Sequence, residues 1–323
     1  MICTVQARRL LVLISAVAAL ATLCSPEIAC SAESMAPTQD SANPGSTSDS
    51  RKSIDTVTVE GQREVRRQID AFVYGILVTY TNESLMRWDA PICPMIGGLP
   101  GDQGEYIVAR LSQVARDVHA PLADPDKPCR PNLLVQVSDN PDAVAEHWAK
   151  HDYLMFNTCN GLGYVNDFLK SKRPVRVFYN GKFRPNDGES SPDIAAYSII
   201  GLTLDLQFGP CTYGSGVAIG TRLRYGAVQD LESVIILVDG RRAARLNIGQ
   251  LADYITMVGL AQIRADAHTG MAPTILKVFD SAEAPAGLSP WDESFLRGLY
   301  TTKQSSIMQT SSIKTSMFQQ LKR

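Results

Sequence analysis

Features that would announce a specific chemistry are missing from this sequence. It has no G-x-S-x-G nucleophile elbow, no phosphate-binding P-loop and no G-x-G-x-x-G fingerprint after a strand-like segment. Charge of one sign is not in excess either, since 31 basic residues nearly balance 33 acidic ones. We therefore do not expect nucleic acid or an acidic membrane surface as a partner. Histidine is rare, with four residues in 323, so few imidazole ligands exist for a metal ion.

The sequence also lacks an apolar run long enough to cross a membrane. An uncharged, mostly apolar run over residues 10–23 follows two arginines, whereas a membrane-spanning helix needs about 20 residues. This arrangement is typical of a cleavable export signal, and we expect cleavage after Ala32. We therefore predict an exported protein, periplasmic or secreted or associated with the outer membrane, whose mature chain has no transmembrane helix. Lipidation at Cys24 or Cys30 is the weaker alternative, because the residues before each differ from a lipoprotein signal.

Cysteine is scarce in the expected mature chain, which keeps Cys93, Cys129, Cys159 and Cys211. An even number in an oxidising compartment favours two disulfides, and four cysteines can pair in three ways. We favour Cys93 with Cys129 and Cys159 with Cys211, because both closed loops are moderate in length and all four cysteines lie next to turn residues. A zinc site is disfavoured, because no C-x-x-C spacing occurs.

Composition divides the chain into four parts. Residues 1–32 are the export signal. Residues 33–53 are rich in Ser, Thr, Pro, Asp and Gly and have too few large apolar side chains to offset the entropy of ordering, so they predict a disordered linker. Residues 54–304 form the globular domain, and the Ser- and Thr-rich residues 305–323 form a C-terminal helical tail. No internal repeat with a fixed period occurs.

Hydrophobic periodicity predicts both helices and strands. Apolar residues at three-and-four spacing, or helix-start signals, predict helices over 64–88, 105–119, 142–151, 248–263, 290–299 and 305–321. Alternating or continuous apolar runs predict strands over 54–60, 133–137, 175–179, 202–208, 218–225 and 234–238, and Pro and Gly predict a loop over 91–104. Because the strands lie mid-chain among unevenly spaced helices, we predict an α+β fold with a single mixed β-sheet and packed helices.

One pair of histidines has helical spacing. The motif H-W-A-K-H puts His147 and His151 on one face of a predicted helix, as two zinc ligands would be. A metal-dependent hydrolase would add a carboxylate such as Glu146 or Asp152. The glutamate of H-E-x-x-H is absent, however, and Lys150 adds a positive charge. We favour a polar helix end, where histidine suits the helix dipole.

A second group of basic residues has two interpretations. The arginines are spread over two segments and could line an anion site, or they could be solvated side chains at a sheet edge. They are Arg222, Arg224, Arg241, Arg242 and Arg245.

Several segments resemble known families. Two segments resemble an uncharacterised family of exported bacterial proteins without known activity. They are M-R-W-D-A-P-I-C-P-M-I-G-G-L-P at 86–100 and G-L-S-P-W-D-E-S-F-L-R-G-L-Y-T-T at 287–302. Residues 233–300 also resemble exported domains of unknown function that are related to gluzincin-type zinc metalloproteases. In that group a strand leads to a helix with a metal motif, then to a segment like P-T-I-L-K-V-F at 273–279 and a closing helix.

The zinc motif of that second group is missing here. Alignment on Gly259-Leu260 places the H-E-x-x-H positions on Ala252, Asp253 and Thr256. Alanine and threonine cannot replace imidazole at zinc, and aspartate is shorter than the glutamate that activates water. The resemblance therefore implies a degenerate, zincin-like fold, a protease-like scaffold without its metal.

Export and absent ligands together favour a non-catalytic function. We expect a binding or structural factor of the cell envelope, with no cofactor and with an envelope protein as partner. The alternative is a metal-dependent hydrolase that uses His147 and His151. Residues 56–63 also resemble the segment that opens the plug of TonB-dependent outer-membrane receptors, which leaves a TonB-linked accessory role open, although no barrel follows.

Overall fold

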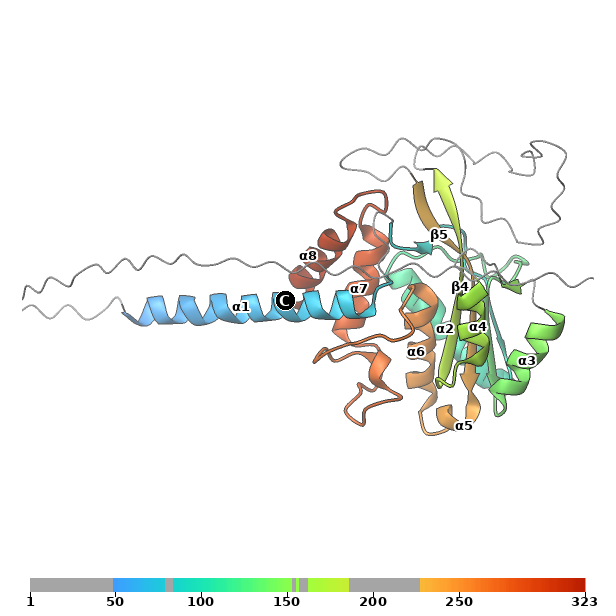
Figure 1. Ribbon diagram of the computed structural model, residues 1–323. Helices are drawn as coiled ribbons and strands as arrows, with labels where there is room; N and C mark the ends of the chain where they lie inside the picture. Colours follow the sequence, from blue (N-terminus) through green and yellow to red (C-terminus); the bar gives the residue numbers. More distant parts are fainter. Residues whose placement is uncertain (1–48, 79–83, 153–154, 157–161, 186–226, 323) are drawn as a thin grey trace, which may run out of the picture. The chain divides into compact units, whose positions relative to one another are not determined.

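A mixed five-stranded sheet organises the part of the chain that the computed structural model describes (Figure 1). The described residues are 49–78, 84–152, 155–156, 162–185 and 227–322. Almost all of them belong to one compact unit, residues 51–323. None of the helices in these ranges combines the length and apolarity that crossing a membrane requires.

The longest strand, β5 (Ala227–Asp239), joins the rest of the sheet. On one side it pairs antiparallel with β4 (Val175–Pro185) along its whole length. On the other side it pairs parallel with β1 (Arg87–Trp88) and β3 (Leu133–Ser138), and β3 pairs parallel with β2 (Pro94–Gly97). Three parallel pairings and one antiparallel pairing make the sheet mixed, which confirms the predicted α+β class.

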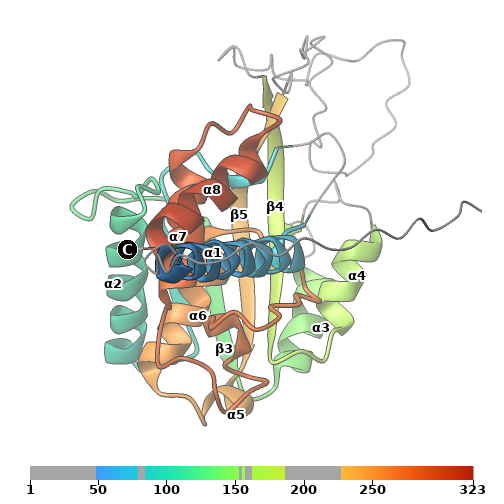
Figure 2. The same cartoon turned by 90° about the vertical axis from the view of Figure 1, so that its left-hand side faces the viewer.

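Helices cover both faces of the sheet, as Figure 2 shows. The main helices are α1 (Asp49–Ile76), α2 (Gly101–Asp117), α3 (Pro141–His151), α4 (Leu162–Lys170), α6 (Ile248–Leu260), α7 (Pro290–Thr301) and α8 (Gln309–Leu321). Helices α3 and α4 lie on one face, and α2, α6 and α7 lie on the other. The alternation of β5 divides the core accordingly, because Ile235 and Leu237 pack toward α3 and α4 whereas Val234, Ile236 and Val238 pack toward α6.

Helix α6 is buried almost all round, so its C-terminal carbonyl groups cannot turn to water. Three aromatic donors from three other elements satisfy them. The Tyr179 hydroxyl on β4 donates to the Val258 carbonyl at 3.0 Å, and the Trp88 indole on β1 donates to the Gly259 carbonyl at 2.8 Å. The Tyr300 hydroxyl on α7 donates to the Leu260 carbonyl at 2.6 Å. These bonds fix the end of α6 against the sheet and against α7.

Most predicted elements are confirmed to within a few residues, and the disulfide between Cys93 and Cys129 is present, with a Cα–Cα distance of 6.1 Å. The other predicted pair, Cys159 with Cys211, lies outside the described residues, as do the predicted strands 202–208 and 218–225. The predicted tail contains α8, whose Ile313 and Met317 are buried in the main core.

Three local predictions are wrong. Residues 54–60 are helical, because their alternating pattern continues into a strongly helical segment, and extending a helix is easier than starting one. The helix predicted over 64–88 ends at Ile76, where amides of residues 264 and 268 bind its last carbonyl groups. The predicted loop 91–104 contains β2, whose four residues are held by pairing with β3 rather than by local pattern. Helix α4 was not predicted.

The α6 cap yields a stability prediction. A Tyr300→Phe variant keeps the ring but leaves the buried Leu260 carbonyl without its donor, so we expect it to lower the free energy of unfolding by about 1–3 kcal/mol. Tyr106→Phe is the matched control, because Tyr106 is 46% exposed and should change stability by less than about 0.5 kcal/mol. Urea denaturation of the three proteins measures both values. Equal stability of Tyr300→Phe and the parent would contradict a role for this bond.

Candidate functional site

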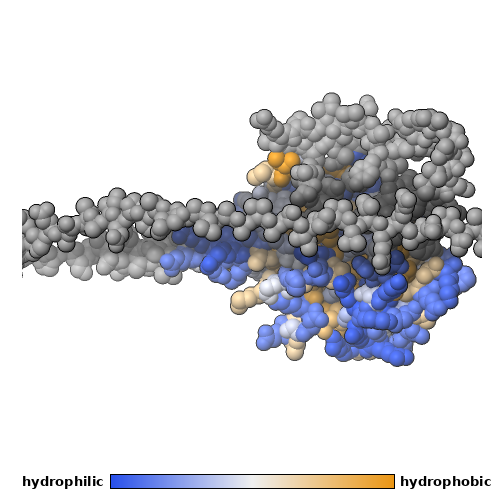
Figure 3. All heavy atoms as spheres, in the orientation of Figure 1, coloured by the Kyte–Doolittle hydropathy of each residue, from blue (hydrophilic) through white to orange (hydrophobic). Residues whose placement is uncertain are grey.

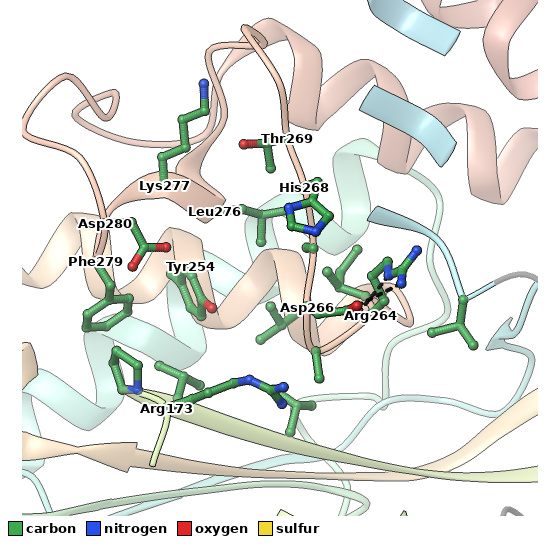
Figure 4. Close-up of a pocket in the computed structure, with 18 of the residues that line it drawn as sticks. Arg173, Tyr254, Arg264, Asp266, His268, Thr269, Leu276, Lys277, Phe279 and Asp280 are labelled. Atoms are coloured by element: carbon green, nitrogen blue, oxygen red, sulfur yellow. Dashed lines mark hydrogen bonds and ion pairs between the residues drawn. The ribbon is translucent and has the colours of Figure 1, made fainter. Parts of the chain in front are cut away.

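A cavity of about 900 Å³ opens between the β4 edge of the sheet and helix α6 (Figure 4). Its main walls are the first half of β4 with the two residues before it, one side of α6, and the segment 263–281 that contains the short helix η3 (Ile275–Lys277). Tyr164 of α4 and the two residues after α1, Leu77 and Val78, complete the lining.

The floor of the cavity is apolar and mostly aliphatic. Because side chains alternate along a strand, Val175, Val177 and Tyr179 of β4 face the cavity while the residues between them face α3 and α4. Helix α6 adds Val258, and η3 adds Leu276. A ligand in this cavity would therefore contact hydrocarbon from both the sheet and the helix layer.

The end of α1 fixes the segment that closes one side of the cavity. The Arg264 amide donates to the Ile76 carbonyl and the His268 amide donates to the Gly75 carbonyl, both at 2.8 Å. A side chain at position 75 would put its Cβ 1.8 Å from the His268 carbonyl oxygen. Only glycine permits this close approach, so the sequence of α1 determines where the cavity segment lies.

The start of α7 holds the same segment further along, at residues 274 and 275. The fully buried Asp292 carboxylate accepts hydrogen bonds from the Thr274 hydroxyl at 2.5 Å, the Ile275 amide at 3.0 Å and the Ser289 amide at 2.9 Å. Burial raises the pKa of Asp292, while these hydrogen bonds act in the opposite direction. The S-P-W-D motif is thus both a helix cap and an anchor for the cavity wall.

Charged side chains form the rim of the cavity. Arg264 and Asp266 make a two-point ion pair at 2.7 and 2.8 Å, which lowers the pKa of the Asp266 carboxyl. The Lys277 ammonium donates to the Gly270 carbonyl at 2.8 Å. By contrast, the Arg173 guanidinium makes no hydrogen bond or ion pair with any residue that the structure describes.

Tyr254 brings a hydroxyl to the wall opposite Arg173. Its ring packs edge-on against Phe279, with the ring centroids 5.1 Å apart. Burial, together with the nearby negative charge of Asp280, raises the pKa of Tyr254 to about 12. The hydroxyl is therefore protonated at neutral pH and can donate a hydrogen bond into the cavity, where Figure 4 shows it.

The predicted histidine pair lies elsewhere, on α3 across the sheet. The His147 and His151 rings are together, with centroids 4.7 Å apart, and His147 Nε2 lies 3.6 Å from an Asp152 carboxylate oxygen. All three side chains are exposed, and Glu146 is paired with Lys150 at 2.7 Å. Within the described ranges, no group of three or more His, Cys, Asp or Glu side chains is placed to hold a metal ion.

The positions aligned with the zinc motif are buried on α6, away from the cavity. Ala252 and Thr256 are fully buried, and the Thr256 hydroxyl donates to the Ala252 carbonyl at 2.7 Å. The Asp253 carboxylate accepts from the Arg110 guanidinium at 2.5 Å and from the Leu288 amide at 2.8 Å. These side chains join α6 to α2 and to the segment before α7, which is a structural role.

The predicted anion site is divided. Arg222 and Arg224 lie outside the described residues. The Arg242 guanidinium donates to the Lys172 carbonyl at 2.8 Å, and the Arg245 guanidinium donates to the Phe279 carbonyl. Two of the three described arginines thus brace the backbone beside the cavity.

Sequence reasoning missed the cavity. Of its polar side chains, His268 is one of the four histidines in the chain, but no neighbouring residue in the sequence marks it as part of a site. Arg173 and Tyr254 carry no local signal, because each becomes part of a site only when β4 and α6 pack together. No protein-family model, curated protein or solved structure matches this chain.

The geometry at α3 gives a prediction for metal binding. If the histidine pair is a polar helix end, a His147→Ala variant should bind zinc no more weakly than the parent protein. Adding zinc should then shift the melting temperature of both proteins equally. Elemental analysis after dialysis against zinc is the measurement, with His119→Ala as the control. Stoichiometric zinc that is lost only in His147→Ala would support the metal-dependent hydrolase instead.

Proposed function

We propose that this chain is an exported, non-catalytic binding protein of the cell envelope, whose ligand occupies the cavity between β4 and α6. Export is supported by the uncharged run at residues 10–23 behind two arginines. The disulfide between Cys93 and Cys129 supports an oxidising compartment, because such bonds are rare in the cytosol.

The observation that carries the proposal is the cavity itself. Its volume of about 900 Å³ lies in the range of small-molecule sites, which are concave and mostly apolar with a few polar groups that fix orientation. This cavity matches that description. Its floor is formed by Val175, Val177 and Val258, and its polar groups include those of Arg173 and Tyr254. Segment 263–281 is held near its start by α1 and at residues 274 and 275 by α7, which supports a preformed cavity.

One face of the molecule bears on the alternative of a large protein interface. On the face shown in Figure 3, the described side chains are mostly hydrophilic, and apolar ones emerge in small groups. Specific protein interfaces concentrate apolar and aromatic residues in a buried centre. The described part of this face therefore gives less support to a large protein interface than the cavity gives to a small ligand.

Binding is favoured over turnover by the chemistry of the lining. Among the described residues, no hydrogen bond joins the His268 imidazole to a hydroxyl that it could activate as a nucleophile. Tyr254 is a poor general base at neutral pH, because its raised pKa keeps it protonated. The described lining thus supplies contacts and hydrogen bonds without a nucleophile and base in position.

A neutral apolar dye tests the proposal. Nile red should bind the full exported protein with one saturable site and a rise in fluorescence. Val177→Trp places a large ring on the cavity floor, and we expect it to weaken dye binding at least about tenfold, since bulk in a site competes directly with the ligand.

Lys182→Trp is the matched control, because Lys182 lies on the same strand, is exposed and does not line the cavity. It should bind the dye as the parent does. Absence of saturable binding in the parent, or equal weakening in both variants, would reject the cavity as a binding site. Hydrolysis of peptide, ester or glycan substrates by the metal-loaded protein would reject the non-catalytic part of the proposal.

A further inference from the structure

The basic side chains of the cavity differ in whether they already have a hydrogen-bond or ion-pair partner. Arg264 is neutralised by Asp266, and the Lys277 ammonium is bound to the Gly270 carbonyl. Arg173 alone among these three basic side chains has no hydrogen-bonding partner within the part of the chain that the structure describes. A guanidinium with free donors is suited to a planar, two-oxygen anion.

An anion bound to Arg173 would lie next to the apolar floor of the cavity. It stands two residues before Val175, and Figure 4 shows it extending along the cavity beneath Tyr254. The positive charge of Arg173 acts on Tyr254, which places the two groups within electrostatic reach of each other. Both a guanidinium and a protonated phenol therefore offer hydrogen-bond donors to a head group in this part of the cavity.

The charge balance of the lining is consistent with an anion. Three basic side chains, Arg173, Arg264 and Lys277, face two acidic ones, Asp266 and Asp280, which leaves one net positive charge before His268 is counted. The ion pair of Arg264 with Asp266 cancels internally. Asp280 lies on the Tyr254 and Phe279 side of the cavity, so an anion is best placed at Arg173.

The rest of the cavity selects the body of the ligand. Aliphatic side chains predominate in the floor, and they are contributed by β4, α6, η3 and the two residues after α1. Such a surface favours hydrocarbon without demanding a fixed ring geometry, in contrast to aromatic stacking sites.

We propose that the cavity binds a long aliphatic carboxylate, with its carboxylate at Arg173 and Tyr254 and its hydrocarbon chain on the floor formed by Val175, Val177 and Val258. This inference rests on the proposed function and adds the chemical class of the ligand. The carboxylate supplies a negative partner for the Arg173 guanidinium, and the hydrocarbon chain fills the apolar volume.

Competition against Nile red separates this inference from the proposed function. Dodecanoate and dodecanol have the same chain and differ in the head group. We expect dodecanoate to displace the dye from the parent protein at about tenfold lower concentration than dodecanol, because a carboxylate gains a charge-assisted hydrogen bond to arginine. Arg173→Gln should remove that difference, and Arg173→Lys should keep part of it, since lysine retains the charge without the planar fork.

Arg297→Gln is the control for charge, because Arg297 is exposed on α7 and lies outside the cavity lining. It should leave the preference for dodecanoate unchanged. Equal displacement by dodecanoate and dodecanol, or a preference that survives in Arg173→Gln, would overturn the carboxylate inference while the binding function stands. Failure of Nile red itself to bind would overturn both.

Discussion

Three aromatic side chains donate hydrogen bonds to the last three carbonyl groups of α6, and the arrangement of the other layers depends on this contact. The carbonyls of Val258, Gly259 and Leu260 end a helix with almost no exposed surface, so each would cost free energy if left without a donor. Their partners come from β4, β1 and α7. The requirement to satisfy one buried helix end therefore sets the position of α6 against the sheet and the closing helix.

That position gives α6 two different sides. One side carries Asp253, which is paired with Arg110 and holds α6 to α2. The other carries Tyr254 and Val258, which line the cavity opposite β4. Tyr179 belongs to both systems, because its ring is part of the cavity wall and its hydroxyl donates to the helix end. The same packing that stabilises the core thus leaves a preformed space between the sheet edge and the helix.

The sequence predicts elements whose signal is local and misses whatever depends on packing. The start of β3 and residues 234–238 of β5 are apolar runs because both faces of the sheet are covered there, and that pattern is visible in the sequence. Asp292 is recognisable as a helix-cap residue, but its bond to Thr274 is not. Arg173 has no local pattern at all. The export signal and the resemblance to gluzincin-related domains stay predictions, since the described residues do not test them.

A crystal structure of the protein grown with dodecanoate tests the binding site most directly. We expect continuous ligand density between β4 and α6, with the carboxylate within hydrogen-bonding distance of the Arg173 guanidinium and with little movement of segment 263–281. Density for the ligand at another surface, with the space beside Val177 and Val258 filled only by water, would contradict the assignment of this cavity as the functional site.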